Sequence, residues 1–239
     1  MPNPLPENEV HVWYCFCDDP GVAVQEDRYR RLLAAEEVAR YERFAFDQDR
    51  RRFLVARGLL RTTLSRYVSV DPAAWRFERT GTGKPFLAMD AGVPPLQFNV
   101  SHSQQLAVCA VTLNRRVGVD VESTTRLASQ RVVKYVLSEH ELSHFSNTTG
   151  EARRQLFYRY WTLKEAYAKA LGIGLSLRFN EFSFHLAEPD PPTIGRNPSA
   201  PASDWKFHQQ KVAPHYWLAV AVECPSGNRP LFKIHQDPH

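Results

Sequence analysis

The sequence contains few cysteines, and their spacing is not typical of a metal site. Its four cysteines lie in apolar runs: Cys15, Cys17, Cys109 and Cys224. The first two form a C-x-C pair, whereas zinc and redox motifs typically use C-x-x-C pairs, which this chain lacks. We therefore expect reduced, buried thiols rather than a cysteine-ligated metal.

The chain also lacks a long apolar run. Stretches such as YWLAVAV are far too short to cross a bilayer, and the segment MPNPLPENEV shows no basic stretch followed by an apolar one. We expect a protein of the cytoplasm that does not contact the membrane. With 239 residues, 43% of them hydrophobic, the chain can bury one large core or two small ones.

Several common catalytic and nucleotide-binding motifs are absent. The turn RTGTGKPF lacks the P-loop spacing and carries a proline where a P-loop has serine or threonine, so it can equally be a plain hairpin connection. No G-x-S-x-G elbow is present. Ser101 and His102 are adjacent on a predicted strand and therefore point to opposite faces, which argues against a hydrolase triad.

Hydrophobic periodicity predicts helices followed by a small antiparallel sheet in each half of the chain. Short β-branched and aromatic runs predict strands at 11–17, 75–80, 96–102, 106–112, 116–123, 180–186, 205–212 and 216–223. Helices are expected at 27–68, with a break near 45–48 where Asp47 caps the second part, and at 128–137, 138–145 and 153–171, the last ended by Gly172. The proline-rich segment 187–203 is expected to be a mobile loop.

The stretch VGVDVES places two carboxylates on one face of a strand. Because strand side chains alternate, Gly118, Asp120 and Glu122 point away from the intervening valines. Two acids on one face repel each other unless a positive group lies between them. From this stretch alone, a solvated outer face explains the acids as well as a cation site does.

The segment YWTLKEAYAKAL is a helix with two distinct faces. Residues 156, 160, 163, 167 and 171 form its apolar stripe, whereas Trp161, Glu165 and Lys169 follow one another at spacings of four on another face. Taken alone, Glu165 and Lys169 are most simply a surface ion pair, which stabilises a helix by about 0.2 to 0.5 kcal/mol.

Basic residues gather on the earlier helix DQDRRRFLVARGLLR. Phe53, Ala56, Leu60, Leu64 and Tyr67 form its predicted buried stripe, and Arg50, Arg57 and Arg61 are expected along its edge. Such arginines usually reach into solvent, although they also suit an anionic partner. The donors of FNVSHS, including Ser101 and His102, are likewise suited to an anion.

Together, GTGKP, FNVSHS, GVDVE and WTLKEA, in this order, closely resemble the 4′-phosphopantetheinyl transferases of the surfactin (Sfp) type. The resemblance extends from about residue 10 to residue 222. It implies transfer of the phosphopantetheine arm of coenzyme A onto a serine of an acyl or peptidyl carrier protein, with release of adenosine 3′,5′-bisphosphate. Which pathway the carrier serves, among fatty-acid, polyketide and nonribosomal-peptide synthesis, is left open.

The resemblance also implies roles for individual residues. Asp120, Glu122 and Glu165 would hold Mg²⁺ against the pyrophosphate of coenzyme A, so that the cation would lie between the two strand acids. Lys164 and Lys169 would contact the pyrophosphate, and Lys169 would stabilise the leaving phosphate. The catalytic set is Asp120, Glu165 and Lys169, and the base is left open between Glu165 and a water held near Glu122.

Further coenzyme A contacts are implied in the first half of the chain. Lys84, Ser101 and His102 match the family's nucleotide and phosphate contacts. Arg40 and Arg79 are basic where the family tends to bind the 3′-phosphate.

The fold that the resemblance implies is a pseudodimer of two similar α+β halves, here residues 1–115 and 116–239. Each half would be a small antiparallel sheet with helices, coenzyme A would lie in the cleft between them, and the protein would be a monomer. Two other functions remain open: a binding module whose arginine helix grips nucleic acid or an acidic partner, and a Mg²⁺-dependent hydrolase of nucleotide pyrophosphates. The first is disfavoured because Phe53 and Tyr67 fall on the buried stripe and no nucleic-acid motif is present.

Overall fold

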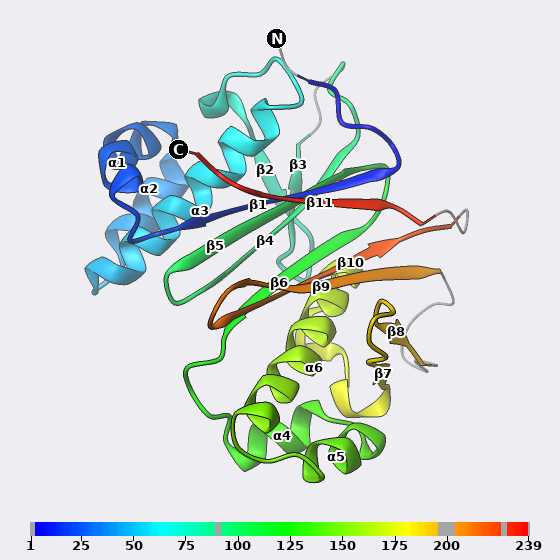
Figure 1. Ribbon diagram of the computed structural model, residues 1–239. Coiled ribbons are helices and arrows are strands. Elements are labelled where there is room, and N and C mark those ends of the chain that lie inside the picture. The colour runs from blue at the N-terminus through cyan, green and yellow to red at the C-terminus, as the bar shows by residue number, and fades with distance from the viewer. Residues whose placement is uncertain (1–2, 89–91, 196–203, 226–228, 239) are drawn as a thin grey trace. The chain divides into compact units, whose positions relative to one another are not determined.

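The computed structural model describes residues 3–88, 92–195, 204–225 and 229–238 (Figure 1). The chain divides into two compact α+β units. Unit 1 comprises Met1–Asn114 together with Leu231–His239, and unit 2 comprises Arg115–Pro230.

A four-stranded sheet forms the centre of unit 1. Its order is β11-β1-β5-β4, with β1 at Glu9–Phe16, β4 at Leu96–Ser103, β5 at Leu106–Leu113 and β11 at Leu231–Gln236. Strands β1, β4 and β5 were predicted from the sequence, whereas β11 was not. It pairs in parallel with β1, beside which it lies in Figure 1, so the end of the chain belongs to the first unit rather than to the predicted second half.

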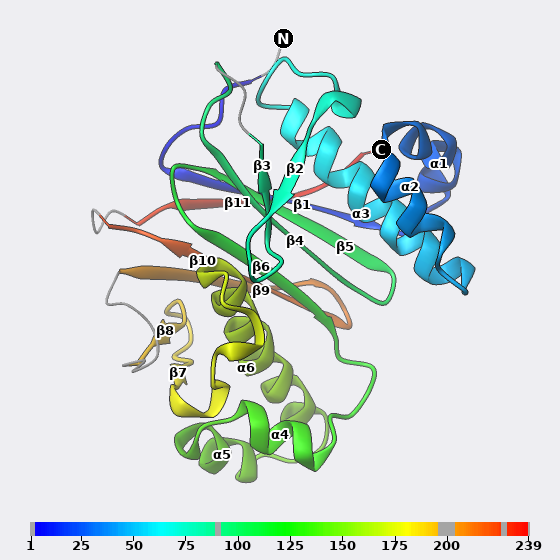
Figure 2. The ribbon, with the colours of Figure 1, turned by 180° about the vertical axis from the view of Figure 1, so that it is seen from behind.

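Three helices accompany the sheet of unit 1 (Figure 2). They are α1 at Pro20–Leu32, α2 at Ala35–Glu42 and α3 at Asp47–Ser65; the short helix η1 at Pro72–Ala74 leads to the hairpin of β2 (Phe77–Arg79) and β3 (Pro85–Leu87). The predicted break before α3 is present, but Phe46 occupies the N-cap and Asp47 is the first helical residue. A second break, at Leu33 and Ala34, was not predicted.

Helix α3 is more deeply buried than the sequence predicted. The expected apolar stripe is confirmed, since its five residues are each at most 8% exposed. The expected arginine edge is only partly correct, because Arg61 is 1% exposed. Gly58 explains the close packing of α1: a Cβ at this position would lie 2.4 Å from the ring of Tyr29.

Unit 2 is built on a three-stranded antiparallel sheet in the order β6-β10-β9. Its strands are β6 at Val117–Ser123, β9 at Trp205–Ala213 and β10 at Tyr216–Glu223, and its helices are α4 at Gln130–Val136, α5 at Glu139–Ser146 and α6 at Gly150–Leu171. Gly172 ends α6 as predicted, because its φ of 73° is a left-handed conformation that glycine adopts without strain.

The connection between α6 and β9 differs most from expectation. The predicted strand at 180–186 is reduced to β7 (Phe184–His185), preceded by the short helices η2 (Gly174–Ser176) and η3 (Phe179–Glu181). Within the predicted loop 187–203, Thr193–Ile194 form strand β8, which pairs with β7. Residues 196–203 lie outside the described part of the chain.

The four cysteines are buried and none forms a disulfide bond, as expected for reduced thiols. Burial raises the pKa of Cys17 to about 12. Among the described residues, no helix is long and apolar enough to cross a membrane.

Candidate functional site

Strand β6 buries both of its faces. Val117, Val119 and Val121 are at most 1% exposed, and Asp120 on the opposite face is only 3% exposed. A solvated outer face is therefore the wrong interpretation of VGVDVES. Burial of a carboxylate is unfavourable unless nearby groups compensate it, so the surroundings of Asp120 are informative.

Gly118 lets the acidic face of β6 approach helix α6. A Cβ at this position would lie 2.0 Å from the carbonyl oxygen of Ala166 and 2.4 Å from the backbone nitrogen of Ala170. Both neighbours are backbone atoms, so neither can move aside as a flexible side chain would. Residues that share this face of β6, Asp120 and Glu122, are thereby brought against α6.

We expect Gly118→Ala to separate β6 from α6. The overlap of its methyl group with the backbone of α6 is larger than the overpacking that usually costs about 1 to 3 kcal/mol, so we expect at least that loss of stability. Chemical denaturation measures the loss. Ala221→Gly, on the neighbouring strand β10, is a control for a one-methyl change without overlap; wild-type stability in Gly118→Ala would contradict the close approach.

Lys169 of α6 pairs with Asp120. Its Nζ donates a hydrogen bond to Asp120 Oδ1 at 2.6 Å, and the side chains are 29% and 4% exposed. Lys169 is therefore not simply the partner of Glu165 in a surface ion pair, because it contacts an acid on β6. A partly exposed ammonium group beside a buried carboxylate remains accessible to an anionic ligand.

Glu165 lies one helical turn before Lys169, in the field of Asp120. Burial, and then the negative charge of Asp120, raise the pKa of Glu165 to about 7, while Lys169 opposes the shift. Two carboxylates thus share a poorly solvated site with one lysine. The repulsion between two such carboxylates decreases when one of them binds a proton or when a cation binds to both.

Glu122 is held by the first residue of the same helical face. Trp161 Nε1 donates a hydrogen bond to Glu122 Oε1 at 3.3 Å. Trp161, Glu165 and Lys169 therefore all act toward the acidic face of β6, which confirms the predicted helical face. The hydrogen bond of Trp161 itself was not predicted, although its spacing of four from Glu165 was the available signal.

Lys164 lies elsewhere, and the expectation that it contacts pyrophosphate is contradicted. Its side chain is 0% exposed, and its Nζ lies 2.5 Å from Glu141 Oε2, whose side chain is also 0% exposed. The same Nζ donates to the carbonyl oxygens of Val136, Phe179 and Phe182 at 2.6 to 2.9 Å. Burial lowers the pKa of Lys164, whereas Glu141 raises it. Lys164 is thus a structural residue that ties α6 to neighbouring segments.

Glu141 was not identified from the sequence as a partner of Lys164. Its Oε2 accepts from the backbone nitrogen of Ser138 at 2.9 Å and its Oε1 from that of Phe184 at 2.8 Å. Ser138 and Glu141 form a capping box at the start of α5, and the sequence S-E-H-E carries that signal.

The raised pKa of Glu165 predicts a pH-dependent effect of Glu165→Gln without Mg²⁺. Folded Glu165 keeps its proton above its ordinary pKa of 4.5, so the wild type loses stability as the pH rises from 4.5 through about 7. Glutamine cannot ionise. We expect the variant to melt above the wild type at about pH 8 and at the same temperature near about pH 5 in thermal melts. A simple surface ion pair predicts the opposite sign at high pH.

The donor set fits a hard divalent cation such as Mg²⁺. The two interacting carboxylates, Asp120 and Glu165, offer oxygen ligands, and the raised pKa of Glu165 reports an excess of negative charge that a cation would relieve. Across residues 3–88, 92–195, 204–225 and 229–238, no group of three or more His, Cys, Asp or Glu side chains is positioned to hold a metal. That Asp120, Glu122 and Glu165 bind it together stays a prediction.

The remaining predicted contacts lie in unit 1. Lys84 follows the turn of the β2–β3 hairpin, in which Arg79 Nη1 donates to the carbonyl oxygen of Gly83 at 3.1 Å. Ser101 is buried and His102 exposed, on opposite faces of β4. Arg40 lies on α2, with its guanidinium carbon 5.2 Å from the centre of the Phe53 ring. A cleft shared by the two units, with coenzyme A in it, stays a prediction.

Comparison with known families matches both units. Residues 116–221 match the model of the 4′-phosphopantetheinyl transferase superfamily, and residues 25–114 match that of the N-terminal part of 4′-phosphopantetheinyl transferase.

Individual relatives cover most of the chain. 4′-Phosphopantetheinyl transferase HetI of Nostoc sp. is 36% identical over 198 residues, covering 82% of this chain and 81% of the relative. 4′-Phosphopantetheinyl transferase of Bacillus subtilis is 30% identical over 179 residues, covering 75% and 78%. L-aminoadipate-semialdehyde dehydrogenase-phosphopantetheinyl transferase of Homo sapiens is 29% identical over 227 residues, covering 87% and 71%.

Proposed function

Because the chain belongs to the 4′-phosphopantetheinyl transferase superfamily, we propose that the facing surfaces of β6 and α6 carry out its transferase chemistry. The protein transfers 4′-phosphopantetheine from coenzyme A to a serine of an apo acyl or peptidyl carrier protein and releases adenosine 3′,5′-bisphosphate. The observation that carries this assignment is the buried Asp120 beside Lys169 and Glu165, where acids and a lysine meet in one partly accessible place.

Asp120, Glu165 and Glu122 would hold Mg²⁺. When bound, the ion would offset the negative charge of the pyrophosphate during attack at phosphorus. The burial of Asp120 and the hydrogen bond from Trp161 to Glu122 restrict the carboxylates to fixed positions before any ligand arrives. Fixed ligands favour catalysis because they need not reorganise as charge develops.

Glu165 and Lys169 would act on opposite sides of the reaction. We propose that the proton of the carrier serine is taken by Glu165 directly or by a water held near Glu122. Lys169, 29% exposed and positively charged, moves from Asp120 toward the leaving bisphosphate and stabilises its charge.

Unit 1 would bind the nucleotide end of coenzyme A. Lys84 and the exposed His102 supply cationic or donor groups for phosphate, and Ser101 supplies a hydroxyl group from the other face of β4. Arg40 and Arg79 would bind the 3′-phosphate. We further propose that the protein acts as a monomer in the cytoplasm, without nucleic acid or membrane.

Intact-mass spectrometry of the carrier tests the proposal. The protein is incubated with coenzyme A, Mg²⁺ and a panel of apo carriers from fatty-acid, polyketide and nonribosomal-peptide systems. We expect a gain of one phosphopantetheine on at least one carrier and none on the matched carrier with its acceptor serine replaced by alanine. Consumption of coenzyme A without a mass gain would instead indicate the Mg²⁺-dependent pyrophosphate hydrolase.

A further inference from the structure

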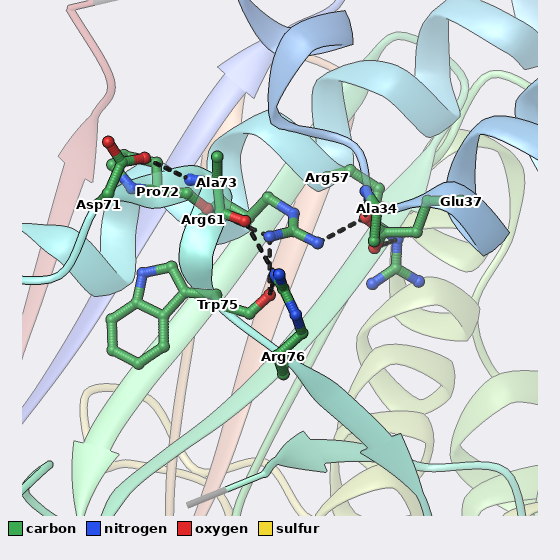
Figure 3. Close-up of polar contacts among 9 residues, drawn as sticks. All are labelled: Ala34, Glu37, Arg57, Arg61, Asp71, Pro72, Ala73, Trp75 and Arg76. Carbon is green, nitrogen blue, oxygen red and sulfur yellow. Dashed lines mark hydrogen bonds and ion pairs between the residues drawn. The ribbon is translucent and has the colours of Figure 1, made fainter. Parts of the chain in front are cut away.

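Four arginines of unit 1 lie within range of one another's charge, and two of them contact the same carboxylate. Arg40 lies on α2, Arg57 and Arg61 on α3 and Arg79 on β2. Glu37 of α2 contacts two of them: its Oε2 lies 2.6 Å from Arg61 Nη2, and its Oε1 lies 3.5 Å from Arg57 Nε. Figure 3 shows Glu37 together with the guanidinium groups of Arg57 and Arg61.

Both terminal nitrogens of Arg61 are used in structural contacts. Besides its contact with Glu37, its Nη1 donates to the carbonyl oxygens of Pro72 at 3.1 Å and of Trp75 at 2.9 Å, as Figure 3 shows. Glu37 Oε2 also accepts from the backbone nitrogen of Ala34 at 3.0 Å, at the start of α2. The better-placed oxygen of Glu37 is therefore used by Arg61 and Ala34, which leaves Arg57 with the longer contact.

Arg57 is poorly compensated for a buried cation. Its side chain is 16% exposed, and its 3.5 Å contact with Glu37 is longer than a good charge-assisted hydrogen bond. Its pKa is lowered first by burial and then by the positive charges of Arg79, Arg40 and Arg61, against the opposing effect of Glu37. Arg57 thus lies in a region of excess positive charge.

Arg57 and Arg40 also share an aromatic support. Their guanidinium carbons lie 5.5 Å and 5.2 Å from the centre of the same Phe53 ring. Contact with an aromatic ring orients a guanidinium group without using its N–H donors. Two guanidinium groups held by Phe53, with Arg79 nearby, suit one ligand that carries several negatively charged oxygens.

We propose that Arg57 completes a site for a phosphate monoester dianion with Arg40 and Arg79, and that this arginine is the main determinant of preference for coenzyme A over its 3′-dephosphorylated form. The inference rests on the proposed function only in naming the 3′-phosphate as the ligand. The phosphate offsets charge that Glu37 alone leaves uncompensated, and it accepts hydrogen bonds from the planar donor fork of Arg57.

Calorimetric binding of two nucleotides tests the proposal without requiring catalysis. Adenosine 3′,5′-bisphosphate carries the 3′-phosphate, and adenosine 5′-monophosphate lacks it. We expect Arg57→Gln to weaken binding of the bisphosphate by about 10- to 100-fold and to change binding of the monophosphate by less than about twofold. Arg57→Lys, which keeps the charge but loses the fork, should fall between.

A matched variant and thermal melts separate this role from a structural one. Arg51 lies on α3 like Arg57, pairs with Glu26 of α1 and is 41% exposed, so Arg51→Gln controls for loss of one arginine and should leave both affinities unchanged. Removing Arg57 relieves crowded positive charge, so ligand-free Arg57→Gln should melt at or above the wild-type temperature. If Arg57 were instead a structural residue, Arg57→Gln would melt below the wild-type temperature.

Three results would overturn the inference. Arg57→Gln could weaken binding of both nucleotides equally, or it could keep the wild-type preference for the bisphosphate. The wild type itself could also show no preference for the bisphosphate. These outcomes are distinct from failure of the proposed function. A wild type that modifies carriers while Arg57→Gln keeps the preference contradicts only the role of Arg57. A preference that depends on Arg57, without carrier modification, supports the phosphate site and contradicts the transferase assignment.

Discussion

Asp120→Asn is expected to lower the single-turnover rate of phosphopantetheine transfer by at least about 10³-fold while the protein stays folded. Asparagine has nearly the same shape as aspartate, so the packing of β6 on α6 is retained. It carries no charge, so it weakens cation binding and removes the carboxylate that lies 2.6 Å from Lys169 in the free protein. Mg²⁺ chelation should lower the wild-type rate similarly.

The control is Glu151→Gln, an exposed acid at the start of α6 that pairs with Arg154. It should transfer at the wild-type rate. Thermal melts of both variants establish that they are folded. A near-normal rate in Asp120→Asn, or in the wild type with excess chelator, would contradict the role given to this carboxylate.

The two lysines of α6 are expected to give opposite phenotypes. Lys164→Met leaves the buried Glu141 without its cation, and breaking one side of such a pair costs about 3 to 5 kcal/mol. For a protein of this size we expect the melting temperature to fall by about 10 °C. Lys169→Met should lower the melting temperature less than Lys164→Met, because Lys169 is 29% exposed, but it should transfer at least about 10²-fold more slowly, because Lys169 would act on the leaving phosphate.

Both variants are compared by thermal melts and single-turnover transfer. The double variant Lys164→Met/Glu141→Leu serves as a further control, because replacing both members of a buried pair by apolar residues removes the uncompensated charge and should recover part of the lost stability. A stable Lys164→Met protein that fails to bind coenzyme A would restore the ligand role first expected for Lys164.

The acidic face of β6 and its partner face on α6 could be predicted from the sequence because two periodicities determine them. A period of two in VGVDVES places Asp120 and Glu122 together, and a spacing of four in α6 places Glu165 and Lys169 together. That these faces oppose each other depends on Gly118, whose missing side chain permits the contact. The sequence does not show this requirement for glycine, because it arises from the backbone of Ala166 and Ala170, which packs against Gly118 in the fold.

The different roles of Lys164 and Lys169 could not be predicted from local pattern. Both are lysines within one motif, and their separation by five residues places them on different faces of α6 without indicating what those faces contact. Glu141 and three backbone carbonyls surround Lys164 only after α5 and η3 have packed against α6. Strand β11 was missed for a related reason, since its pairing with β1 joins opposite ends of the chain.

Binding of Mn²⁺, a paramagnetic substitute for Mg²⁺, tests the carboxylate site most directly. Free Mn²⁺ is quantified by its electron paramagnetic resonance signal in the presence of coenzyme A, for the wild type, Asp120→Asn and Glu151→Gln. We predict that the wild type and Glu151→Gln bind the ion with equal affinity and that Asp120→Asn binds it at least about 10-fold more weakly. Equal binding by all three proteins would contradict a metal site built on Asp120.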